Sequence, residues 1–110
     1  MKKIKLCMMM EKNRYQKIIT LTLKRKWFDL IKYGIKLEEY REIKPYWTKR
    51  LLGKDYDTII FRNGYSTNAP IIICEYKGLE VGDGNIDWGA EYGETYYVIK
   101  LGKILDILND

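Results

Sequence analysis

The pattern of hydrophobic and polar positions predicts a chain built mostly from short strands. Runs that are β-branched, or that alternate apolar with polar side chains, are typical of strands packed on one face. Two further apolar stretches, 79–81 after a bend at Gly78 and 104–108, are candidates to extend the last two strands. The main predicted strands span residues 18–23, 37–43, 58–62, 71–76 and 96–101.

Two short helices are predicted in the first half of the chain. Apolar residues recur at helical spacing over 25–33, and Gly34 follows where a C-terminal glycine cap belongs. Pro45 opens a second helical turn that runs to Leu52, before a glycine. Five or six short strands with two such helices predict an α+β fold, a small curved sheet or barrel of mostly antiparallel strands with short flanking helices.

Length and composition indicate one globular domain. The chain has 110 residues, of which 46% are hydrophobic and 32% charged, and no apolar run is long enough to span a membrane. We expect residues 1–15 to be a frayed leader and residues 16–110 to form the domain. Cys7 and Cys74 lie far apart, which favours a reducing, cytoplasmic location, and the absence of histidine excludes His-based catalysis and His-metal sites.

Charge is distributed unevenly along the chain. Residues 1–54 hold 16 Lys and Arg against 5 Asp and Glu, whereas residues 55–110 hold 4 against 10. Such asymmetry predicts one face that attracts anions, although a solvated surface and a basic leader are a competing interpretation. The three cations Lys24, Arg25 and Lys26 stand at the start of the first helix, where an anion such as a phosphate would relieve their unfavourable placement.

The corner between the first helix and the second strand carries the clearest candidate chemistry. Glu39 and Arg41 lie two residues apart in a predicted strand, so their side chains share a face and can form an ion pair. Alternation would place Lys36 opposite them, and it joins them only if it lies in the corner before the strand begins. A surface ion pair is the alternative interpretation of this segment.

The spacing G-x-K-x-x-E-x-R, formed by Gly34, Lys36, Glu39 and Arg41, resembles the signature of the ASCH domain, of the PUA-like superfamily. The resemblance covers roughly residues 18–105. It implies a small β-barrel with a cleft that binds RNA or a related ligand. Some relatives hydrolyse acylated cytidine nucleosides, and others have been described as ribonucleases; the former carry Thr where this chain has Glu39, so the hydroxyl nucleophile is missing here.

Two other segments carry candidate residues. Arg62, Asn63 and Tyr65 follow a strand, and this trio suits a nucleobase and its phosphate, although Asn63-Gly64 is also the signal of a type I′ hairpin turn. The glycine-rich segment 82–93 resembles a calcium loop in its acidic spacing but lacks the required glycine, so no metal is predicted; we expect it to form a lid, or to be anchored by Trp88.

These observations favour a module that binds RNA, other single-stranded nucleic acid or a modified nucleotide, with no cofactor and no membrane partner. Its predicted ligand-binding residues are Lys24, Arg25, Lys26, Lys36, Glu39, Arg41, Arg62, Asn63 and Tyr65. One alternative is a small hydrolase acting on a nucleoside or RNA, in which Lys36 and Glu39 transfer protons. Another is a protein–protein adaptor whose Tyr and Trp side chains form an interface.

Overall fold

The computed structural model describes residues 17–110, which form a five-stranded, strongly curled sheet with two short helices. The predicted leader and Cys7 therefore lie outside the described residues. Strand order is β1-β3-β4-β5-β2; β1 pairs with β3 in parallel, and every other neighbouring pair is antiparallel. The strands are β1 (Ile18–Thr22), β2 (Glu38–Glu42), β3 (Thr58–Arg62), β4 (Ile71–Asp83) and β5 (Thr95–Leu108).

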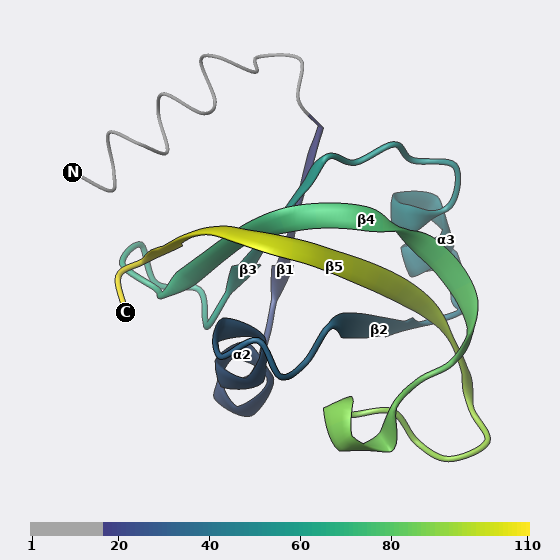
Figure 1. Cartoon of the computed structure of the whole chain (residues 1–110). Helices are drawn as coiled ribbons and strands as arrows, with labels where there is room; N and C mark the ends of the chain where they lie inside the picture. The colour runs from purple at the N-terminus through teal and green to yellow at the C-terminus, as the bar shows by residue number, and fades with distance from the viewer. Residues whose placement is uncertain (1–16) are drawn as a thin grey trace.

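This arrangement confirms the predicted α+β class and the curved sheet, which closes about half of a barrel (Figure 1). Curvature is concentrated in the long β4–β5 ribbon, where pairing register shifts between Ile73 and Gly78. Such bulges bend a strand and increase its twist. Both predicted extensions are present, because β4 continues through residues 79–81 and β5 through residues 104–108.

Helix α2 (Arg25–Lys32) packs its Phe28 and Ile31 side chains into the core. It ends as predicted at Gly34, whose φ of 74° only glycine adopts without strain. Gly34 N–H donates to the Ile31 carbonyl and the next amide donates to the Leu30 carbonyl, which is the Schellman pattern. Trp27, on the same helix, is only half-buried, because it lines a cavity described below.

Helix α3 (Pro45–Leu51) begins at proline as predicted and buries Leu51. Neither α2 nor α3, nor the short 3-10 helix η1 (Ile86–Trp88), is long and apolar enough to cross a membrane. The main core lies between the inner face of the sheet and the helices, and its fully buried members include Phe28, Ile59, Phe61 and Ile72. Cys74 is fully buried, and burial raises the pKa of its thiol to about 12.

The predicted tight hairpin turn at Asn63-Gly64 is wrong. Gly64 has a positive φ of 101°, but Asn63 does not, and β4 begins only at Ile71. The segment 63–70 is instead a longer loop, closed where Asn63 N–H donates to the Pro70 carbonyl. The Asn63 side chain donates to the Leu23 carbonyl at 3.0 Å, so this residue joins the loop to the end of β1.

Candidate functional site

The half-barrel leaves an opening between its two edge strands, β1 and β2, which we refer to as the seam. Arg41 crosses it, since its Nη2 donates to the Thr22 carbonyl at 3.4 Å. A cavity of about 310 Å³, the seam cavity, lies at this crossing. Its lining residues come from the end of β1, the start of α2, the middle of β2 and the end of η1 with the residue after it, and are Thr22, Leu23, Lys24, Trp27, Glu39, Tyr40, Arg41, Trp88 and Gly89.

The hydrogen bonds within the sheet determine which main-chain N–H and C=O groups of β1 and β2 point into the seam. Leu101 N–H donates to the Leu37 carbonyl, so the alternating antiparallel ladder directs the main chain of Glu39 toward β5 and that of Tyr40 away from it. Leu23 N–H donates to Arg62 in β3, which in the same way directs the Thr22 carbonyl toward the seam. The Thr22 carbonyl of β1 and the main-chain groups of Tyr40 in β2 therefore both point into the seam.

A buried ion cluster of Lys36, Glu39 and Arg41 lies between these walls. Glu39 Oε1 is 3.2 Å from Lys36 Nζ, and Glu39 Oε2 is 2.8 Å from Arg41 Nη2. Lys36 is 2% exposed and Glu39 6%. Lys36 precedes β2, so the pleat does not force it to the opposite face, and it joins Glu39 and Arg41 in one cluster. Lys36 itself is buried and is not among the residues that line the seam cavity.

Lys36 is held more tightly than the sequence indicates. Its Nζ donates to the Trp88 carbonyl at 2.5 Å and lies 5.3 Å from the Trp27 ring centre and 4.8 Å from that of Tyr40. Burial is the largest influence on its pKa and lowers it, against the opposing attraction of Glu39. The ammonium group thus fastens the end of η1 to the segment that precedes β2.

Arg41 has an exposed side and an incompletely satisfied guanidinium. Its side chain is 19% exposed, and the guanidinium carbon lies 4.9 Å from the centre of the Trp47 ring. The Nε atom is buried and has no hydrogen-bond partner in the part of the chain that the structure describes. Because Glu39 fixes one edge of the guanidinium, Arg41 presents a pre-oriented cation to the seam cavity.

A second set of hydrogen bonds and ion pairs, centred on Tyr40 and Glu38, holds the segment after β4 over the site. Tyr40 Oη donates to Glu38 Oε1 at 2.7 Å and accepts from Asn85 N–H at 2.9 Å, and Lys100 pairs with Glu38. Burial raises the pKa of the Tyr40 hydroxyl, and the negative Glu38 adds to that rise. For Glu38 burial acts to raise the pKa, but the hydrogen bonds from Lys100 and Tyr40 outweigh it and the pKa is lowered.

The glycine-rich segment therefore lies over the seam, anchored in part by Trp88, as the sequence analysis anticipated. Trp88 packs partly buried against a small cluster of Tyr40, Ala90 and Val98. The backbone at Gly89 approaches Trp27 so closely that an added Cβ would lie 3.1 Å from the ring, and its φ is 105°. A side chain at Gly89 would therefore be both strained and crowded.

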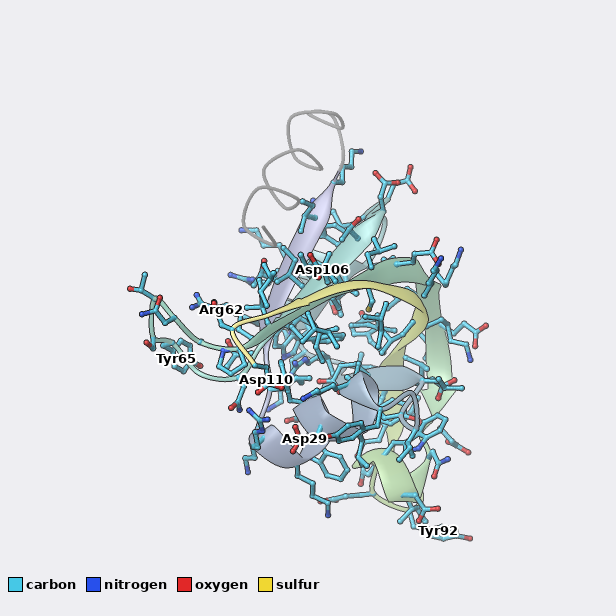
Figure 2. The ribbon with its side chains drawn as sticks, turned by 60° about the vertical axis from the view of Figure 1, so that its left-hand side comes forward. Asp29, Arg62, Tyr65, Tyr92, Asp106 and Asp110 are labelled. Carbon is cyan, nitrogen blue, oxygen red and sulfur yellow. The ribbon has the colours of Figure 1, made fainter. Side chains whose placement is uncertain are left out.

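The three cations at the start of α2 are not equivalent. Lys24 lines the seam cavity, and Lys26 Nζ lies 4.7 Å from the Trp27 ring centre. Arg25 pairs instead with Asp29 and Asp110, at 3.0 and 2.8 Å, on the side of α2 where the chain ends (Figure 2). Lys24 is thus the member of this trio that the structure brings to the cavity.

Arg62 and Tyr65 are not among the residues that line the seam cavity. Both line a separate cavity of about 770 Å³, which shares no lining residue with the seam cavity. Arg62 Nη2 donates to the Ser66 carbonyl at 2.5 Å, and Tyr65 is 86% exposed. Of the predicted ligand-binding residues, Lys24, Glu39 and Arg41 thus line the seam cavity, and Arg62 and Tyr65 line the separate one. The remaining four line neither cavity, and are Arg25, Lys26, Lys36 and Asn63.

Sequence reasoning missed the aromatic part of the site. The rings of Trp27, Tyr40 and Trp47 lie against Lys36 or Arg41, and Trp88 also lines the seam cavity. None of these four residues was among the predicted ligand-binding residues. A signal was available, because 14% of the chain is aromatic and so small a core cannot hide every ring. The pattern could not say which rings would lie at the site.

Comparison with known proteins adds no assignment, since no family model, no curated protein and no solved structure matches the chain.

Proposed function

We propose that this chain binds single-stranded nucleic acid, RNA by preference, or a modified nucleotide, through the seam cavity. The observation that carries the proposal is a cation-rich cavity with aromatic walls: Lys24 and Arg41 line it together with Trp27 and Trp88. Unpaired bases are recognised by stacking on aromatic rings, and their phosphates by lysine and arginine.

The size and polarity of the seam cavity support one nucleotide unit as the ligand. About 310 Å³ is at the small end of ligand pockets, and a planar base fits such a space better than a folded peptide does. Tyr40 main-chain groups and the Arg41 guanidinium offer hydrogen bonds to a base edge or phosphate. Lys24 at the rim adds attraction for the backbone.

The resemblance of Gly34, Lys36, Glu39 and Arg41 to the ASCH signature supports the same proposal. In this interpretation the chain is a PUA-like module that acts in the cytoplasm, and the ion cluster is its ligand-binding signature. Glu39 lines the seam cavity, where it orients Arg41 and holds Lys36.

A hydrolase that uses Lys36 and Glu39 is the second candidate. The observation in its favour is the lowered pKa of Lys36, since active-site lysines are often tuned by burial. Against it, Lys36 Nζ is already engaged by Glu39 and the Trp88 carbonyl, which leaves it little freedom to move a proton. Binding without turnover is therefore the preferred function.

Replacing Arg41 tests the proposal. We expect Arg41→Ala to weaken binding of short single-stranded RNA by about 1–3 kcal/mol, because a cation aimed at a phosphate or base edge is lost. Fluorescence anisotropy at low salt measures the effect, and affinity should fall with added salt as counterions are released. Product analysis by chromatography in the same mixtures, including acylated nucleosides, tests the hydrolase candidate.

Arg50→Ala is the matched control. Arg50 lies on α3, its guanidinium stacks on Tyr46 at 3.5 Å, and it lines none of the cavities described above. We expect this variant to bind like the wild type. Equal affinities for wild type and Arg41→Ala, or no RNA binding at low salt, would refute the proposed function.

A further inference from the structure

The Arg62–Tyr65 cavity differs from the seam cavity in the chemistry of its lining residues. Its floor is apolar, formed by Ile60, Ile71 and Leu108, and its rim is polar. Among residues 17–110, Arg62 is the one charged residue that lines it, and no carboxylate does. Apart from Ala69, the remaining lining residues supply hydroxyls, side-chain amides and an exposed ring, and are Thr20, Tyr65, Thr67, Asn68 and Asn109. This chemistry suits a planar apolar ring joined to an anion.

The two cavities are neighbours along β1. Thr20 lines the Arg62–Tyr65 cavity and Thr22 lines the seam cavity, and residues two apart in a strand project to the same side, about 6.6 Å apart. Leu23 lines the seam cavity, and its carbonyl accepts the Asn63 side chain. The loop that carries Tyr65 is therefore fastened at the boundary between the cavities.

The opposite side of the seam has a different character. A cavity of about 670 Å³ adjoins the seam cavity there and shares Tyr40, Arg41 and Gly89 with it. Three of its lining residues are acidic, Glu42, Glu91 and Glu94, against the cations Arg41 and Lys44. A polyanion that leaves the seam cavity meets net negative charge on this side and only Arg62 on the other.

We propose that the Arg62–Tyr65 cavity is a second nucleotide subsite, so that a single strand runs from the seam cavity past Leu23 and Asn63 onto Tyr65. The base in this subsite stacks on Tyr65 above the apolar floor, and its phosphate meets Arg62. Because the acidic side repels the backbone, the seam cavity holds the terminal nucleotide of the strand. This inference rests on the proposed function and defines its ligand as a strand end at least two nucleotides long.

A length series measured with the full chain tests the second subsite. Affinities are determined by isothermal titration calorimetry for a mononucleotide, a dinucleotide and a trinucleotide, each with wild type, Tyr65→Ala and Tyr92→Ala. We expect the dinucleotide to bind wild type roughly 5- to 150-fold more tightly than the mononucleotide, since stacking one more base contributes this much. Tyr65→Ala should abolish that gain and leave mononucleotide affinity unchanged.

Tyr92→Ala is the matched control, because Tyr92 is as exposed as Tyr65, at 91%, and lies at the far end of the molecule (Figure 2). It should behave like the wild type with every ligand. A second experiment compares a linear oligonucleotide with a circular one of the same sequence, and a seam cavity that holds a strand end should bind the linear form more tightly.

Failure of this inference differs from failure of the proposed function. If the mononucleotide binds through Arg41 but the dinucleotide gains nothing, or Tyr65→Ala weakens both ligands equally, the second subsite is refuted and the proposed function stands. If Tyr65→Ala changes the mass measured by light scattering instead of dinucleotide affinity, a second copy of the chain occupies this cavity and the inference is also refuted. If no ligand binds, both fail.

Discussion

The inner face of the sheet and the seam are both buried, but they are built from opposite chemistry. The inner face consists of fully buried apolar side chains such as Ile59, Phe61 and Ile72, whose attraction has no preferred direction. The seam buries Lys36 and Glu39, which contact each other at defined distances and in defined orientations. The first region tolerates changes of shape if volume is kept, whereas the second depends on each partner being present.

The largest difference between the regions should appear when one partner of the ion cluster is removed. We expect Glu39→Ala to lower the free energy of unfolding by about 3–5 kcal/mol, because it leaves Lys36 and Arg41 without their shared counter-charge. Urea unfolding followed by circular dichroism measures this loss. A loss below about 1 kcal/mol would mean that the cluster behaves like a surface ion pair.

Ile72→Ala is the control from the apolar region. It should lower stability by about 2–5 kcal/mol through the cavity it creates, which is a similar loss. The folded fraction of Ile72→Ala should still bind RNA like the wild type, whereas that of Glu39→Ala should bind more weakly, because Arg41 is no longer held. If the two variants bind RNA with equal affinity, the ion cluster matters no more for binding than the apolar core does, and the proposed difference between the two regions is wrong.

A smaller effect, a change of stability with pH, should distinguish the seam from the inner face of the sheet. The pKa of Lys36 is lowered by burial, so below pH 10.5 there is a window in which the unfolded chain holds a proton that the folded chain has lost. Stability then rises with pH in that window, by at most about 1.4 kcal/mol per pH unit for one proton. We expect this rise in wild type relative to Lys36→Met, measured by urea unfolding at a series of alkaline pH values.

Cys74 acts in the opposite direction, because its raised pKa makes folding less favourable as pH rises above 9.0. It is present in both proteins, so it cancels in the difference between them. A difference that does not change with pH would contradict the lowered pKa of Lys36.

The helices and strands could be predicted from the sequence, because the spacing of apolar residues along each element indicates which of its faces is buried. The β-branched runs at 18–23 and 58–62 became β1 and β3, and Gly34 ended α2 where the chain needed a positive φ. The convergence of Glu39 and Arg41 also followed from the two-residue period of a strand. These predictions depend only on neighbours along the chain.

Contacts set by loop closure could not be predicted in this way. The Trp88 carbonyl meets Lys36, and Asn85 meets Tyr40, only because the segment after β4 folds back across the seam. Asn63-Gly64 misled for a related reason: the Asn63 amide bonds to the Leu23 carbonyl, a partner supplied by a distant strand. Turn propensity is a local preference, and here a tertiary hydrogen bond prevailed.

The strand order also has a consequence for the order of assembly. Strands β3, β4 and β5 are consecutive in the chain and pair as neighbours, whereas β1 must find β3 across α2, β2 and α3, and β2 must find β5 across β3 and β4. Pairings that close longer loops cost more chain entropy and form later.

The two walls of the seam, β1 and β2, are therefore held by the β1–β3 and β2–β5 pairings, which we expect to form late. We expect their amides to exchange with deuterium through openings smaller than global unfolding, while those of β4 stay protected. A ligand that bridges β1 and β2 would slow exchange at the seam first, so native-state hydrogen exchange would detect binding as local kinetic protection. Equal protection of all five strands without ligand would contradict this order. On this view the site is completed last during folding and is the first part of the sheet to open.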